Sequence, residues 1–176
     1  MEEPKLLSQS WDEGKVTLPP DFLQNGWNLF LPKGTISILL SVMTYILQGY
    51  TKEEILEWMK MEEKELSLSP FDFTLPFVCK SEEEKQAYLN IARQERKICK
   101  ILERSGYAYP KTIDEWIELL IQLKIVQEVK MDEAIYLDVV LEPFPHPEDM
   151  LKLTPDERKK LEKYRLNQHM QQLSEL

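Results

Sequence analysis

Four segments with helical hydrophobic spacing open with the same short pattern, Ser/Thr-x-x-Glu, and this pattern limits the fold more than any other feature. The four copies begin at Thr51, Ser81, Thr112 and Thr154. In such a capping box, the hydroxyl accepts a hydrogen bond from the backbone N–H three residues later, and the glutamate reaches back to the first residue. The sequence therefore predicts a chain built mainly from helices that begin at these residues.

The spacing of apolar residues completes the secondary-structure prediction. Residues 36–47 are apolar on every face and precede Gly49, which is typical of a buried helix. After the third capped helix, β-branched and aliphatic residues predict an antiparallel hairpin over 125–130 and 135–141. The expected fold class is α+β and predominantly helical: a winged-helix-like unit with extra N- and C-terminal helices and a hairpin near 125–141. The expected helices cover 36–47, 51–64, 82–105, 112–123 and 154–176.

The chain is expected to form one compact unit, or two winged-helix-like halves divided near 66–80. A loose polar arm precedes a short strand from Val16 to Leu18 and a turn or short helix capped by Asp21. Alternating apolar residues in the proline-containing linker predict an extended segment packed on the core. Prolines also predict an extended link over 143–147. The expected segments are the arm 1–15, the helical part 16–65, the linker 66–80, the winged-helix-like part 81–142 and the C-terminal part 143–176.

The succession of a helix over 82–105, a short turn, a helix over 112–123 and a hairpin resembles a helix-turn-helix with a wing. Residues 116–126 look like the end of the second helix running into the first wing strand, with Lys124 in place of the usual glycine. This resemblance covers residues 85–141. Residues 35–65 resemble a second, degenerate helix-turn-helix. The whole chain is similar to small proteins without an assigned function in bacteria and their phages.

The resemblance implies that residues 112–123 correspond to the recognition helix of winged-helix proteins, which usually carries basic and polar residues. The charges here are acidic instead, at Asp114, Glu115 and Glu118. Over residues 112–142, eight acids face two bases, for a net charge of −6. Such a surface would repel DNA phosphates, so the resemblance favours a protein-interaction winged helix over a DNA reader.

Positive charge is concentrated in two of the predicted helices, although the net charge is −9. Residues 85–104 hold six bases and two acids, and residues 152–165 hold six bases and three acids. Either these are solvated helix faces, or a basic helix docks on an acidic surface such as nucleic acid or the acidic region of another copy. Trp11, in the polar arm, is a further candidate contact. The candidate interaction residues are Arg93, Arg96, Lys97, Lys100, Arg104, Asp114, Glu115, Glu118 and Trp11.

The sequence offers no catalytic, cofactor or metal site to name. Cys79, Cys99, His146 and His169 would complete a zinc site only together, and their spacing matches no known pattern. Phosphate-binding glycine loops are absent. Two tryptophans, Trp58 and Trp116, lie on apolar helix faces and are expected in the core. Residues 36–47 are too few to span a bilayer, and no signal peptide is recognisable, so we expect a cytoplasmic protein without a membrane partner.

We therefore expect a non-enzymatic, intracellular protein-interaction or regulatory module whose partner is another protein or a second copy, as a homodimer. The alternative is a nucleic-acid-binding regulator of transcription or replication that uses the basic helix 85–104; the acidic region 112–142 disfavours it. An enzyme of unrecognised type is a third hypothesis.

Overall fold

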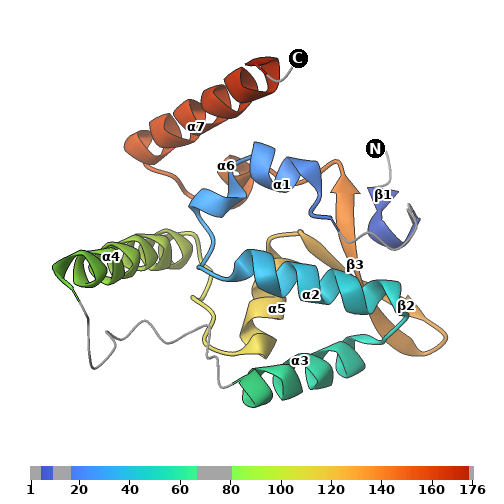
Figure 1. The fold of residues 1–176 in the computed structure, drawn as a ribbon. Coiled ribbons are helices and arrows are strands. Elements are labelled where there is room, and N and C mark those ends of the chain that lie inside the picture. The colour runs from blue at the N-terminus through green and yellow to red at the C-terminus, as the bar shows by residue number, and fades with distance from the viewer. Residues whose placement is uncertain (1–4, 10–16, 67–80, 175–176) are drawn as a thin grey trace.

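The computed structural model describes residues 5–9, 17–66 and 81–174. Among them, seven α-helices and a three-stranded antiparallel sheet confirm a predominantly helical α+β fold. Figure 1 shows α1, α2, α3 and α5 around the sheet, whereas α4 and α7 extend from this body on one side. The elements are β1 (Lys5–Leu6), α1 (Pro20–Gln24), α2 (Thr35–Leu47), α3 (Lys52–Leu66), α4 (Glu82–Arg104), α5 (Ile113–Gln122), β2 (Val126–Met131), β3 (Ala134–Glu142), α6 (Pro147–Met150) and α7 (Pro155–Ser174), with short 3-10 turns at Leu7–Gln9 and Trp27–Leu29.

The hydroxyl cap is formed at all four predicted capping boxes, and the reciprocal glutamate bond is formed at Thr51 and Thr154. Thr51 accepts from the Glu54 N–H at 3.2 Å, and Glu54 accepts from the Thr51 N–H at 3.0 Å. The same backbone-to-hydroxyl bond closes at Ser81, Thr112 and Thr154. Each cap contributes about 1 kcal/mol to its helix, so the pattern fixes where α3, α4, α5 and α7 begin.

The predicted hairpin is confirmed in unbroken register, from Val126 opposite Val139 to Met131 opposite Ala134. Its two-residue turn, Asp132 and Glu133, has positive φ angles of 48° and 64°, as tight hairpins require. Lys124, the residue in the usual glycine position, has a φ of 64°. This left-handed backbone is the conformation that glycine adopts most easily, and it turns the end of α5 directly into β2.

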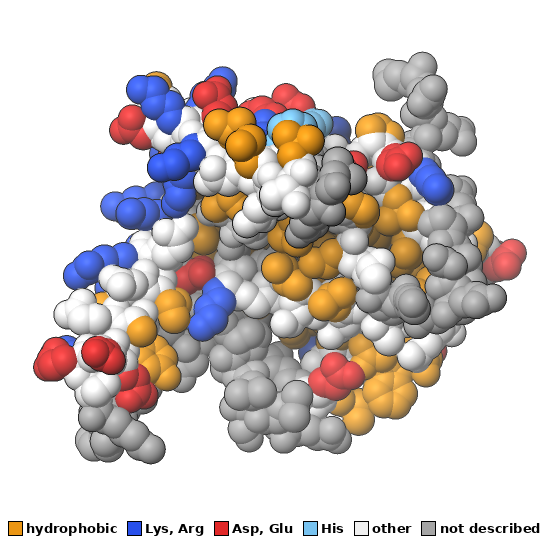
Figure 2. Space-filling view, turned by 45° about the horizontal axis from the view of Figure 1, so that its top comes forward, with side chains coloured by type: hydrophobic (Ala, Val, Ile, Leu, Met, Phe, Trp, Pro, Cys, Tyr) orange, Lys and Arg blue, Asp and Glu red, His pale blue; other side chains and the backbone are white. Residues whose placement is uncertain are grey.

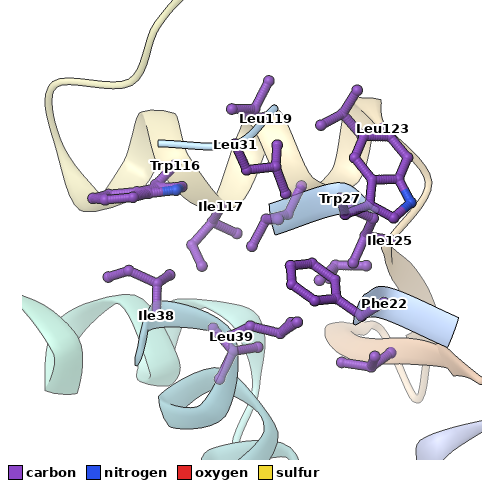
Figure 3. Close-up of a cluster of buried hydrophobic side chains, with 14 of the residues drawn as sticks. Phe22, Trp27, Leu31, Ile38, Leu39, Trp116, Ile117, Leu119, Leu123 and Ile125 are labelled. Carbon is purple, nitrogen blue, oxygen red and sulfur yellow. The ribbon is translucent and has the colours of Figure 1, made fainter. Parts of the chain in front are cut away.

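Helix α5 is the centre of the core. Figure 3 shows its side chains directed towards those of α2 and of the segment around α1. The Trp116 indole N–H donates to the Thr35 hydroxyl at 3.1 Å, and this hydroxyl donates to the Pro32 carbonyl at 2.6 Å. Polar atoms in the core are thus paired, which avoids the cost of burying them unsatisfied. The fully buried side chains of α5 and of the residue that follows it are Trp116, Ile117, Leu119, Leu120 and Leu123.

The prediction of a loose N-terminal arm is wrong for residues 5–9. Strand β1 pairs antiparallel with β3 and completes the sheet in the order β1-β3-β2. Ser8 explains why this segment docks: its N–H donates to the buried Asp138 carboxylate at 3.1 Å, and its hydroxyl donates there as well. Thr17 and Leu18 are not in a strand, and Pro19, not Asp21, precedes the first turn of α1.

The predicted extended link is extended only as far as His146, because Pro147 begins the short helix α6. Proline suits the first position of a helix, since its missing N–H would have no partner there. The link is anchored at the Pro145 carbonyl, which accepts from the Trp27 indole at 2.7 Å and from the Asn25 amide at 3.1 Å.

One residue that the sequence placed in the core lies at the surface. Trp58 on α3 is 43% exposed, with its ring centroid 6.2 Å from that of Tyr50, while Trp116 is fully buried as predicted. Tyr88 on α4 is 39% exposed and Leu173 on α7 is 53% exposed. These last two positions face away from the body because α4 and α7 are only partly docked. The predicted linker packing falls on residues outside those described.

A candidate interaction surface on helices α4 and α7

Helix α4 is anchored to the body through a buried carboxylate in its second half. Glu95 is 7% exposed and accepts from the Lys33 backbone N–H at 2.9 Å and from the Tyr109 hydroxyl at 2.7 Å. Burial, together with the hydrogen bond to Glu95, raises the pKa of the Tyr109 hydroxyl, so the phenol stays protonated and keeps donating to Glu95. The opposite face of α4 is therefore directed to solvent.

Of the five candidate interaction bases on α4, four lie on that solvent face. Arg93, Arg96, Lys97 and Lys100 are exposed, and no ion pair within the described part of the chain uses them. Their spacing of three and four residues places them in one row along the helix. The row therefore presents several unpaired positive charges in the same direction.

The fifth base, Arg104, joins α4 to α7 and is not part of the free row. Its guanidinium donates to the Lys152 carbonyl at 2.8 Å and forms an ion pair with Glu157. Glu157 is also the glutamate of the α7 capping box and accepts from the Thr154 N–H at 2.8 Å. The C-terminal end of α4 and the N-terminal end of α7 are thereby held together.

Helix α7 rests on the body through one narrow face. Leu161 is buried so closely against Gly26 that a Cβ atom there would lie 2.4 Å from its Cδ1. Arg165 donates to the Glu148 carboxylate at 2.7 Å and to the Asn25 carbonyl at 2.9 Å. Burial by itself would raise the pKa of Glu148, but its hydrogen bond and ion pair with Arg165 hold that pKa below the ordinary value.

The remaining bases of α7 extend the positive surface of α4. Arg158, Lys159, Lys160 and Lys163 are all exposed. Figure 2 shows Lys and Arg side chains gathered along the side of the molecule that α4 and α7 form. We call these four residues, with Arg93, Arg96, Lys97 and Lys100, the basic surface. The sequence predicted two separate basic helices, and the structure brings their adjoining ends together through Arg104.

The acidic candidates on α5 have different surroundings. Asp114 forms an ion pair with Lys60 of α3 at 2.8 Å. Glu115 accepts from the Lys111 N–H at 2.8 Å, one residue before the Thr112 cap. Glu118 is exposed and has no ion pair among the described residues. Two of the three predicted acidic contacts therefore already serve the fold, and Trp11 lies outside the described residues.

Two observations concern the reactive side chains of the described ranges. Burial and a hydrogen bond to Glu103 raise the pKa of the Cys99 thiol, which opposes formation of a nucleophilic thiolate. No group of three histidine, cysteine, aspartate or glutamate side chains among the described residues is placed to hold a metal ion. Every helix in the described ranges is too short or too polar to cross a bilayer.

An apolar groove of about 600 Å³ lies between the end of α5, the start of β2 and the link before α6. Its apolar lining includes Val126, Val140 and Phe144, and His146 and Asp149 stand among its polar residues. His146 is half exposed and lies 3.6 Å from Glu148, so it is engaged with the end of α6. The groove contains no cysteine, serine or threonine that could serve as a nucleophile.

Sequence reasoning missed the two buried carboxylates that position these elements. Glu95 occupies a place in the apolar spacing of α4, between Ile91 and Ile98, and this position was a usable signal. Asp138 stands between aliphatic residues in β3. The alternation of side chains along a strand predicts which face of the sheet a residue lies on, but not which segment covers that face. Its partner, Ser8, is 130 residues away, and no local pattern connects the two.

Comparison with known proteins gives a family. No curated protein and no solved structure matches this chain. A family model described as "Family of unknown function (DUF6042)" matches residues 16–175, which include every element described above except β1 and its following turn. Because the match spans nearly the whole chain, the protein belongs to the DUF6042 family.

Proposed function

We propose that this protein is a non-enzymatic, self-associating protein-interaction module of a regulatory kind, whose basic surface binds an acidic region of a partner protein. The observation that carries the proposal is the row Arg93, Arg96, Lys97 and Lys100, which is exposed and unpaired among the described residues. A chain with a net charge of −9 has ample acids to neutralise such a row internally. Complementary charge would steer a partner to the row and fix its orientation.

A winged-helix-like unit is part of this proposal. Helix α5 leads directly into the hairpin through Lys124, and α3 packs beside α5 with the Lys60–Asp114 ion pair between them. In a DNA-binding winged helix, the face corresponding to that of α5 would be basic. Here it carries Asp114, Glu115 and Glu118, which supports a protein-binding use of the unit.

A nucleic-acid partner is the second candidate, favoured by one observation. The exposed bases of α7 adjoin those of α4, so the basic surface extends over two helices (Figure 2). Phosphate binding on such a surface would weaken steeply as salt rises.

Charge reversal of the row tests the proposal. The R93E/R96E/K97E variant changes the net charge by the same amount as a control variant, K33E/K111E/K124E, whose bases lie outside the basic surface. We expect the unaltered protein and the control to capture the same partner protein from nuclease-treated cell extract at 50 mM salt. We expect R93E/R96E/K97E to capture about one tenth of that amount of the partner protein or less, because complementary charge is lost.

Two outcomes would contradict the protein-binding proposal. Equal capture by R93E/R96E/K97E and the control would show that the row is a solvated surface only. Capture that disappears on nuclease treatment, together with a salt-sensitive shift of duplex DNA or RNA by the unaltered protein, would favour the nucleic-acid partner.

A further inference from the structure

The outer strand of the sheet, β2, has an open edge. The sheet order β1-β3-β2 places β2 at one side, and no other strand of the described chain pairs with it. The Val140 N–H donates to the Ile125 carbonyl at 3.1 Å, so Val140 directs its backbone polar groups towards the β2 side of the ladder. Bonded pairs alternate along an antiparallel ladder, so Val126, Glu128 and Lys130 direct their backbone N–H and C=O groups away from β3.

Two of the usual features that prevent strand pairing are absent from this edge. It is regular over Val126–Met131 and contains neither proline nor a bulge. Met131 is 54% exposed, and Ile135 beside it on β3 is 44% exposed. Figure 1 shows the hairpin extending beyond the helices at one end of the molecule. A regular exposed edge of this kind is a template for another strand.

The sequence of β2 is complementary to itself in an antiparallel register centred on Val129. In that register Glu128 faces Lys130 of the second copy, and Lys130 faces its Glu128, on the same side of the sheet. Opposite charges directly across an antiparallel pair are stabilising. Val129 faces its own counterpart on the other side, and Met131 faces Gln127. A register centred on Glu128 would instead oppose two identical carboxylates, so the charges select the first arrangement.

Glu128 is already held in the orientation that this register needs. Its Oε1 accepts from the Lys52 ammonium of α3 at 2.5 Å, and its side chain remains 40% exposed. Its second carboxylate oxygen is available to a lysine from another chain. The Lys52–Glu128 pair would thus continue across the interface to Lys130.

We propose that two copies of this chain associate through β2, forming one continuous antiparallel sheet across a two-fold axis at Val129. The inference rests on the proposed self-association and names the surface that carries it. The interface is small and consists of main-chain hydrogen bonds flanked by two reciprocal ion pairs. Small interfaces are characteristic of reversible association, so we expect a dimer that forms at micromolar concentrations.

Sedimentation velocity of the full chain across about 1 to 300 μM, at 50 mM salt, tests this proposal. E128K and K130E are each expected to weaken self-association at least about tenfold, because each places like charges opposite one another. An equimolar mixture of E128K and K130E is expected to restore it as a heterodimer, since each lysine then faces a glutamate. E128K/K130E is expected to self-associate again for the same reason. E57K, an exposed glutamate on α3, is the matched control.

A backbone variant tests the edge separately from the charge, because K130P is compared with K130A, which loses the same charge and keeps the backbone N–H. K130P removes an N–H that faces away from β3, so the hairpin keeps its internal bonds while the edge loses a donor. Circular dichroism of every variant confirms that the fold is retained. K130P is expected to be monomeric throughout the concentration range.

The outcomes separate this inference from the proposed function. Self-association of the unaltered protein that survives E128K, K130E and K130P would overturn the β2 interface and leave a self-associating module. A monomer at every concentration would overturn both. Loss of self-association in E128K and in K130E, with recovery of the dimer in their mixture, would support the β2 interface in this register.

Discussion

Helices α5 and α7 begin with the same capping box and then lie in opposite surroundings. Trp116, Ile117 and Leu120 of α5 are fully buried, whereas Leu166, Met170 and Leu173 of α7 are each more than half exposed. The narrow face at Leu161 and Arg165 holds α7 to the body, and the Arg104–Glu157 ion pair joins it to α4. A cap determines where a helix starts, and the distribution of apolar residues around the helix determines what it packs against.

Truncation of a large side chain in each helix should give the largest difference. We expect Trp116→Ala to lower the free energy of unfolding by about 3–5 kcal/mol, because it leaves a cavity in the core and removes a partner of Thr35. Leu166→Ala on α7 is expected to change it by less than about 0.5 kcal/mol, because its side chain is already in water. Urea denaturation measures both values. Similar losses would mean that the two helices do not differ in packing as described.

Two glycine substitutions should separate the docking of α7 from backbone strain. Gly26 and Gly49 both have positive φ angles, of 89° and 85°, so alanine costs about 1–2 kcal/mol at either position. A Cβ at Gly26 would also meet Leu161, whereas nothing lies within 4 Å at Gly49. We expect Gly26→Ala to be the more destabilising and to make α7 more sensitive to limited proteolysis. Equal effects on unfolding and proteolysis would show that the Leu161 contact is easily displaced.

Removal of the hydroxyl cap should also affect α5 and α7 differently. Thr112→Ala and Thr154→Ala each lose a hydroxyl that caps a helix, at about 1 kcal/mol. At α5 this loss should lower global stability, since α5 cannot open without exposing the core. At α7 it should increase hydrogen exchange locally and leave the slowest core amides unchanged. Global acceleration in Thr154→Ala would contradict the partial docking of α7.

The smallest expected effect is the response of α7 to acid. Because the folded pKa of Glu148 is lowered, its pair with Arg165 contributes stability above the ordinary glutamate pKa and loses it as the pH falls through the lowered value. Glu148→Gln should be less stable than the unaltered protein at pH 7, and this difference should shrink below about pH 4. Denaturation at several pH values measures it. A difference that is constant with pH would argue against a role for the charge.

Local sequence patterns predicted the helices and strands of this fold well. Contacts between residues far apart in the sequence were predicted poorly. The capping boxes, the central position of α5 and the hairpin with its turn follow from residues close together in sequence. The docking of Leu7–Gln9, the burial of Glu95 and the joining of α4 to α7 depend on contacts between distant residues. The prediction that Trp58 is buried also failed, because an apolar helix position is buried only where another element covers it.

For the candidate surface, the sequence predicted which helices are basic but not which bases are free. Arg93 and Arg104 belong to the same helix and have the same charge, yet Arg104 is engaged by Glu157 and the Lys152 carbonyl. The acidic candidates divide in the same way, since Asp114 is paired with Lys60 and Glu118 is exposed. Charge is a property of the residue, whereas its availability depends on the tertiary fold.

The contact between Ser8 and Asp138 has a consequence for biosynthesis. The two residues are separated by 130 positions, so a ribosome must add the chain from one to the other before the sheet can be completed. At ordinary translation rates this takes about 7 to 26 seconds. Strand β1 pairs with β3, so it has no β-strand partner during this interval. Ser8 is therefore made well before the sheet position that it completes can exist.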